Sequence, residues 1–99
     1  MDAEPKRKSY RDSLLERLQD PAEAAAYLDA ALGEEDSRVF LLALRDVAEA
    51  RGIGRVAAEA DLNRESLYRM LSEEGNPRLS SLEALLHAFG LRLAVEVRD

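Results

Sequence analysis

Residues 53–72 constrain the fold more than any other stretch, because they have the pattern of two short helices joined by a tight turn. Asp61 lies where the turn favours a residue that tolerates a left-handed backbone, and Leu62 would plug that turn. Asn63 is suited to cap the second helix, since its side-chain oxygen can accept a backbone N–H. The apolar side chains at helical spacing are Val56, Ala57 and Ala60 before the turn, and Leu67, Met70 and Leu71 after it.

This pattern is typical of a helix-turn-helix, whose second helix lies in the major groove of DNA. An ordinary pair of packed helices has the same spacing, so both interpretations stay open on the pattern alone. The outward face of the second helix favours DNA, because Arg and Tyr side chains can contact phosphates and base edges. The candidate DNA-binding residues are Asn63, Arg64, Glu65, Ser66, Tyr68, Arg69 and Ser72.

Length and composition exclude several classes of protein. The 99 residues predict one domain with a modest core, and such small domains gain from oligomerisation. Cysteine is absent and His87 is the single histidine, so we expect no disulfide, metal site or cofactor. No apolar run reaches the roughly 20 residues of a membrane span, and residues 1–8 lack the apolar segment of a secretory signal. We therefore expect a cytoplasmic protein.

The charge is unevenly distributed along the chain. The net charge of −6 argues against DNA binding through bulk electrostatics, although it is compatible with a local basic face. Residues 1–36 carry most of the acidic excess, whereas residues 37–99 are nearly neutral. The acidic segment suits a basic protein partner, and the alternative is a solvated surface that maintains solubility.

The N-terminal third begins with residues 1–8, which we expect to be flexible. Their basic side chains, Lys6, Arg7 and Lys8, are candidates for contacts with DNA phosphates. Residues 9–18 have helical apolar spacing, or Tyr10 anchors an extended arm instead.

Three further helices are expected outside the helix-turn-helix. The first begins at Asp20-Pro21 and ends at Gly33. The second spans about residues 37–51 after a cap at Asp36, and its many apolar residues predict the central core helix. The last ends near Phe89, before Gly90, and begins with a capping box formed by Ser80 and Glu83.

Residues 91–97 change to an alternating pattern that predicts a half-buried β-strand. Its apolar members are Leu91, Leu93, Val95 and Val97. A lone strand leaves its backbone groups unpaired, so we expect it to pair with the same strand of a second copy about a two-fold axis. The alternative is a strand that merely lies on the helical core. The residues thus predict an all-α domain over 9–99, with a C-terminal strand that pairs across a dimer.

A family resemblance rests on longer runs of sequence. The run from Val39 to Gly52, followed by the run from Asn63 to Pro77, resembles the addiction-module antidote family, that is, HigA-type antitoxins. Upstream residues 25–32 and downstream residues 88–93 also fit, so the resemblance covers about residues 9–97. One departure from the general helix-turn-helix pattern is Asp61, where glycine is commoner.

This resemblance implies a five-helix, lambda-repressor-like helix-turn-helix fold and a type II toxin–antitoxin system. The protein would neutralise a small basic RelE/HigB-like toxin, an mRNA-cleaving ribonuclease, and repress its own operon by binding operator DNA. We expect the acidic N-terminal third to face the toxin, with exposed apolar side chains beside the charges. The candidate toxin-binding residues are Tyr10, Leu14, Leu18, Tyr27 and Leu28.

An enzyme is not expected, because the sequence offers no nucleophile–base pair and its carboxylates are scattered over helix surfaces. Two other functions remain as alternatives to an antitoxin. One is a stand-alone phage-type repressor, and the other is a helical protein-interaction module that does not bind DNA.

Overall fold

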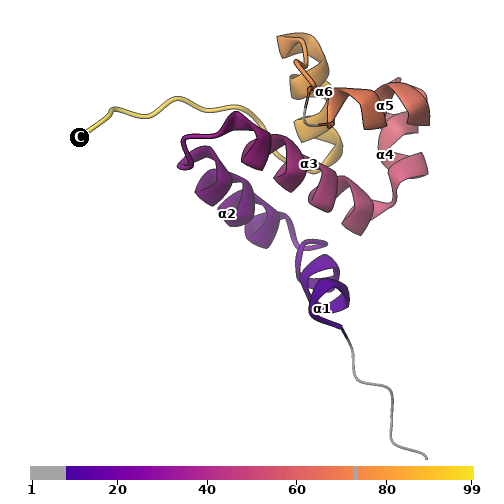
Figure 1. The fold of residues 1–99 in the computed structure, drawn as a ribbon, viewed down its shortest axis with the longest axis horizontal. Helices are drawn as coiled ribbons and strands as arrows, with labels where there is room; N and C mark the ends of the chain where they lie inside the picture. The colour runs from indigo at the N-terminus through magenta and orange to yellow at the C-terminus, as the bar shows by residue number, and fades with distance from the viewer. Residues whose placement is uncertain (1–8, 73) are drawn as a thin grey trace, which may run out of the picture.

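The computed structural model describes residues 9–72 and 74–99, and this part of the chain is all-helical (Figure 1). Helix α3 crosses the middle of the molecule, with α1 and α2 on one side and α4, α5 and α6 on the other (Figure 1). Residues 91–99 leave the helices as an extended tail. The helices are α1 (Tyr10–Arg17), α2 (Pro21–Leu32), α3 (Ser37–Arg51), α4 (Ile53–Glu59), α5 (Arg64–Met70) and α6 (Leu79–Ala88).

Side-chain caps define the starts of the first three helices. The Ser9 hydroxyl accepts the backbone N–H of Asp12 at 3.0 Å, which satisfies one free donor at the start of α1. Asp20 caps α2 in front of Pro21, and Asp36 caps α3, as the sequence predicts. These caps fix where each helix begins, and the helical spacing of the apolar side chains decides which face is buried.

The core is built around α3, which has the buried face predicted for a central helix. Leu44, Val47 and Ala48 have no exposed surface, and α1, α2 and α4 all pack against α3. α4 in turn packs against α5 and α6, so the second half of the core continues through it. The largest fully buried side chains are Phe89, Leu18, Leu44, Leu67, Leu71, Leu85, Val47 and Val56.

The predicted count of five helices is wrong, because six helices form within the described residues. Of the two conformations that the sequence allows for residues 9–18, a helix and an extended arm, the structure has the helix. Ser9 provides its cap, and Leu14 and Leu18 anchor it in the core with 7% and 1% of their surfaces exposed. Burial of these two side chains explains why α1 is helical although it is only 8 residues long.

The predicted C-terminal β-strand is also wrong, since the structure contains no strand within residues 9–72 and 74–99. The tail is extended beyond Leu91, but an extended conformation becomes a strand only when another strand pairs with its backbone. No second strand is available in the described chain. Val95 and Val97 are 99% and 96% exposed, so their alternating side chains are not half-buried either.

The predicted capping box at Ser80 and Glu83 does not form. α6 begins at Leu79, with Arg78 in the cap position, and no side chain caps its first turn. Ser80 is therefore already inside the helix. The C-terminal end of α6 is as predicted. The helix ends at Phe89 because Gly90 directly after it adopts a left-handed backbone, with a φ of 80°.

We predict that Phe89→Ala destabilises the protein by about 3–5 kcal/mol, because it removes a fully buried ring and leaves a cavity. Leu32→Ala is the matched control, since Leu32 is 61% exposed on α2 and should change the free energy of unfolding by less than about 0.5 kcal/mol. Urea unfolding followed by circular dichroism measures both values. Equal destabilisation by the two substitutions would contradict this description of the core.

Candidate nucleic-acid interface

Helices α4 and α5 form the predicted helix-turn-helix, joined by a turn with two unusual features. Asp61 has a φ of 59°, which confirms the left-handed backbone predicted at this position. The backbone N–H of Leu62 donates to the carbonyl of Ala57 at 2.8 Å and closes the turn. Asn63 then caps α5 as predicted, because its side-chain oxygen accepts the Ser66 N–H at 2.6 Å.

The inner faces of the two helices are fixed by burial. Val56 and Ala57 on α4 are 0% and 2% exposed, and Leu67 on α5 is completely buried. Ala57 allows the two helices to approach closely because its side chain is small. α5 therefore has one face held in the core and the opposite face exposed to solvent.

The predicted DNA-binding residues lie mostly on this exposed face of α5. Arg64, Glu65, Tyr68 and Arg69 are exposed. Ser66 and Ser72 are half-buried, and Ser72 donates its hydroxyl proton to the Arg69 carbonyl at the end of the helix. Asn63 is exposed but uses its side-chain oxygen to cap the helix.

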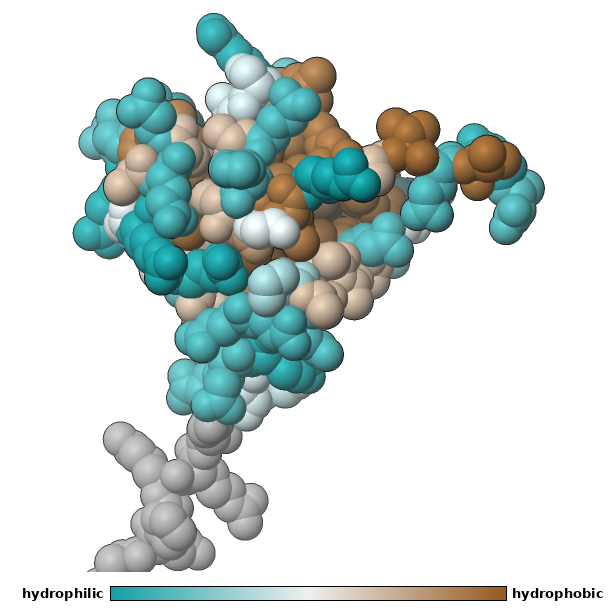
Figure 2. Space-filling view, turned by 180° about the vertical axis from the view of Figure 1, so that it is seen from behind, coloured by the Kyte–Doolittle hydropathy of each residue, from teal (hydrophilic) through white to brown (hydrophobic). Residues whose placement is uncertain are grey.

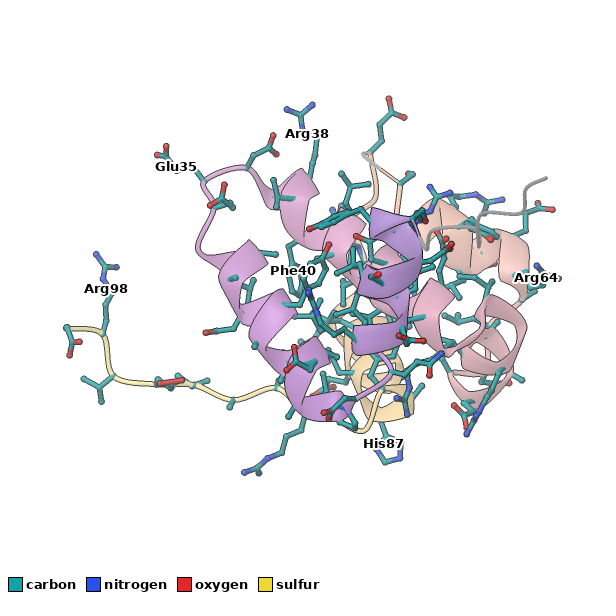
Figure 3. The ribbon with its side chains drawn as sticks, turned by 90° about the horizontal axis from the view of Figure 1, so that it is seen from below. Glu35, Arg38, Phe40, Arg64, His87 and Arg98 are labelled. Atoms are coloured by element: carbon teal, nitrogen blue, oxygen red, sulfur yellow. The ribbon has the colours of Figure 1, made fainter. Side chains whose placement is uncertain are left out.

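The charged groups on this face differ in how strongly they are engaged. Arg69 lies 3.4 Å from Glu65 one turn earlier, with both side chains largely exposed. Such surface pairs contribute little stability, so an incoming phosphate can compete for Arg69. Arg64 points outward at the end of the molecule opposite Arg98 on the tail (Figure 3).

Three basic residues on or beside the helix-turn-helix were not identified from the sequence. Arg78 lies with Arg69 along a groove of about 430 Å³ beside α5. Arg55 is exposed on α4, 3.6 Å from Glu59. Arg45 of α3 lies with its guanidinium carbon 5.2 Å from the centre of the Tyr68 ring, within the range of a cation–π contact. The contact joins residues from distant parts of the chain, so local spacing could not indicate it.

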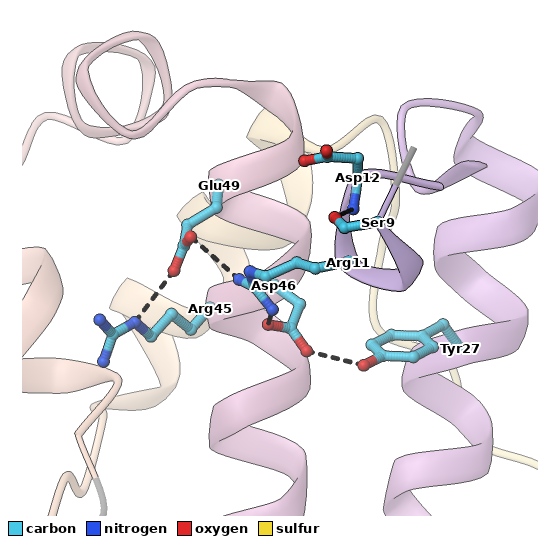
Figure 4. Close-up of polar contacts among 7 residues, drawn as sticks. All are labelled: Ser9, Arg11, Asp12, Tyr27, Arg45, Asp46 and Glu49. Atoms are coloured by element: carbon cyan, nitrogen blue, oxygen red, sulfur yellow. Dashed lines mark hydrogen bonds and ion pairs between the residues drawn. The ribbon is translucent and has the colours of Figure 1, made fainter. Parts of the chain in front are cut away.

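A second polar cluster joins α1, α2 and α3 (Figure 4). Arg11 of α1 contacts Asp46 at 3.1 Å and Glu49 at 2.9 Å. Glu49 also accepts from Arg45 at 3.1 Å, and Asp46 accepts from the Tyr27 hydroxyl at 2.7 Å. Both carboxylates are thus shared between elements that are distant in sequence.

The cluster shifts the pKa values of Glu49, Arg11 and Tyr27. Partial burial alone would raise the pKa of Glu49, but hydrogen bonds from Arg11 and Arg45 outweigh burial and lower it. Hydrogen bonds to Glu49 and Asp46 raise the pKa of Arg11. Partial burial and the hydrogen bond to Asp46 raise the pKa of Tyr27 to about 12.

The candidate toxin-binding residues are not all on the surface. Tyr10 is 81% exposed, but Leu14, Leu18 and Leu28 are buried, so the expectation that Leu14 and Leu18 are exposed is wrong. Tyr27 is half-buried with its hydroxyl bound to Asp46. Helical spacing gives the apolar face of α1 but does not reveal whether a partner or α3 covers it.

The tail lies at the other end of the molecule from α5 (Figures 1 and 3). Apolar surface gathers at its base, and apolar side chains stand out along it (Figure 2). A groove of about 680 Å³ runs there between α2, α6 and the tail, with Leu28, Leu32 and Phe40 among its lining residues. His87 is exposed and lines this groove.

The described residues contain no group of three or more acidic or histidine side chains placed to hold a metal ion. None of their helices is both long and apolar enough to cross a membrane. Lys6, Arg7 and Lys8, the proposed phosphate contacts near the N-terminus, lie outside the described residues.

Comparison with known proteins assigns the family. Residues 10–97 match the family described as probable addiction module antidote protein. The chain belongs to this family. A protein of Haemophilus influenzae Rd, described only as uncharacterized, is 35% identical to this antidote over 81 residues, 82% of this chain and 84% of that protein. No solved structure matches the chain at a significant level.

Membership of this family confirms the predicted resemblance to addiction-module antidotes. It implies a toxin partner of some kind, and it is consistent with a regulatory protein that is not an enzyme.

We predict that Tyr27→Phe removes part of the alkaline sensitivity of the antidote's stability. Because the folded-state pKa of Tyr27, about 12, exceeds the ordinary value of 10.0, its stabilising contribution is complete below pH 10. It is then lost as the pH rises from 10 towards 12. The urea midpoint of the wild type should fall more steeply over this interval than that of Tyr27→Phe, and parallel curves would contradict the assignment.

Proposed function

We propose that this antidote is a HigA-type antitoxin with a lambda-repressor-like helix-turn-helix. It binds operator DNA through α5 and neutralises a RelE/HigB-like ribonuclease toxin through α1 and α2. The observation that carries the proposal is the membership of the antidote family together with a capped α5 whose outer face bears Arg64, Tyr68 and Arg69.

The charge distribution supports DNA binding at α5 despite the acidic net charge. Arg55, Arg64, Arg69 and Arg78 are all exposed on or beside the helix-turn-helix. Glu59 and Glu65 offset part of this charge. A small number of phosphate contacts therefore suits this face better than broad electrostatic attraction, and base contacts from Arg64 and Arg69 would provide specificity.

On the opposite side of α3, helices α1 and α2 have features suited to a toxin-binding surface. Tyr10 is a large exposed side chain, and amphipathic aromatic residues are enriched in protein interfaces. Exposed acidic residues along α1, at the cap of α2 and along α2 complement a basic toxin; they include Asp12, Asp20, Glu23 and Asp29. Since α3 separates this surface from α5, the antitoxin can hold both partners without overlap of the two sites.

The antitoxin also acts as a dimer in this proposal, because operators read by helix-turn-helix proteins commonly have paired half-sites. Leu93, Val95 and Val97 of the tail are exposed, and the groove at its base is lined with apolar side chains. The four tail residues, Leu91, Leu93, Val95 and Val97, and the groove together provide apolar contact area for a second copy of the chain. The contact requires side-chain packing alone and no β-strand.

The alternatives differ in what they require of these surfaces. A stand-alone phage-type repressor would use α5 without a toxin, and an interaction module would use α1 and α2 without DNA. Membership of the antidote family favours a protein with a toxin partner over the repressor. The exposed arginines of α5 favour DNA binding over the module.

We predict that Arg69→Ala weakens binding to the DNA upstream of the protein's own gene by about 1–3 kcal/mol if Arg69 contacts a base. The matched control is Arg17→Ala, which removes the same charge from α1 on the far side of α3. Fluorescence anisotropy at fixed salt measures both affinities. If Arg64→Ala combined with Arg69→Ala leaves the affinity unchanged, α5 is not the DNA-binding helix.

We predict that Tyr10→Ala weakens binding of the toxin encoded by the adjacent gene at least tenfold, as loss of an aromatic interface residue commonly does. The fold should persist because Tyr10 is 81% exposed. Growth rescue and copurification with the toxin measure the effect. Tyr68→Ala is the control and should neutralise the toxin normally. If the Tyr10→Ala variant rescues growth as well as the wild type does, Tyr10 is not part of the toxin interface.

A further inference from the structure

Arg45, a member of the cluster drawn in Figure 4, also contacts Tyr68 on the helix proposed to bind DNA. Arg11 donates to one oxygen of Glu49, and the Nε of Arg45 donates to the other oxygen. The guanidinium of Arg45 then lies over the ring of Tyr68 on α5, 5.2 Å from its centre. An unbroken line of contacts therefore runs from α1 across α3 to α5.

Glu49 is the branch point of this line. It uses separate oxygens for its two arginine partners, at 2.9 Å for Arg11 and 3.1 Å for Arg45. If Arg11 leaves, Glu49 is free to rotate and to engage both nitrogens of Arg45, because a carboxylate and a guanidinium pair best in a two-pronged geometry. The guanidinium would then move relative to the Tyr68 ring.

The exposure of these groups indicates orientation rather than stability as their role. The side chains of Arg11 and Arg45 are 49% and 43% exposed, and ion pairs this close to solvent contribute little to folding. Glu49 is less exposed, at 26%, and two fixed donors restrict its rotamers. Tyr68 is 37% exposed, so the core alone does not hold its ring.

We propose that Arg11, Glu49 and Arg45 are positioning residues for Tyr68, so that the docking of α1 on α3 controls how α5 presents this ring to DNA. The proposal rests on the proposed function only for its consequence in DNA binding. A partner that binds α1 and withdraws Arg11 from Glu49 would release the ring and weaken operator binding.

The test compares Arg11→Gln with Arg17→Gln. Both substitutions remove one charge from α1, but Arg17 pairs with Glu23, at 3.8 Å, rather than with Glu49. NMR of the free protein should show shifted Tyr68 ring signals, assigned with Tyr68→Phe, in Arg11→Gln and unshifted signals in Arg17→Gln. Glu49→Gln provides a second variant, with the same expected shift, if Arg11→Gln folds poorly.

The same variants are then measured for binding to a duplex covering the DNA upstream of the gene. Arg11→Gln should weaken binding roughly three- to tenfold, the cost of ordering one freed side chain on association. In a Tyr68→Ala background it should have no further effect, because the ring through which it acts is absent.

Unshifted Tyr68 signals in Arg11→Gln, or an undiminished effect of Arg11→Gln in the Tyr68→Ala background, would overturn the proposal. Failure of the proposed function gives a different result, in which the wild type binds no upstream DNA. In that case the ring signals of the free protein still decide whether Arg11 positions Tyr68.

Discussion

Burial of α3 is the constraint on which the rest of the structure depends. Leu44, Val47 and Ala48 have no exposed surface, and helices from both halves of the chain pack against α3. α4 and α5 contain only 7 residues each, too few for a stable helix in isolation. The helix-turn-helix therefore exists because α4 is held against α3 and α6, and α5 is held against α4.

The polar edge of α3 has a different role from its buried face. Asp46 and Glu49 receive hydrogen bonds from Tyr27 of α2, Arg11 of α1 and Arg45 of α3 itself. The partly exposed ion pairs of Arg11 and Arg45 add little to the free energy of folding compared with the core. They fix orientation, and so they relate the proposed toxin surface on one side of α3 to the proposed DNA surface on the other.

Local features of the fold were predictable from the sequence, and features that depend on distant partners were not. Asn63 as a cap and Asp61 as a left-handed residue follow from their neighbours, and both are confirmed. The prediction of a β-strand at residues 91–97 was wrong, because an alternating apolar pattern does not provide the second strand that a β-strand must pair with. Burial of Leu14 and the Arg45–Tyr68 contact were missed for the same reason, since each depends on an element far away in the chain.

Native-state hydrogen exchange tests most directly whether α3 is the scaffold of both halves. The amides of Val47 and Ala48 lie in the fully buried part of α3 and should exchange only through global unfolding. Their free energy of exchange should equal that of urea unfolding, whereas the amides of α1 should exchange through a smaller, local opening. Exchange of the α3 amides at a lower free energy than those of α1 would contradict this account.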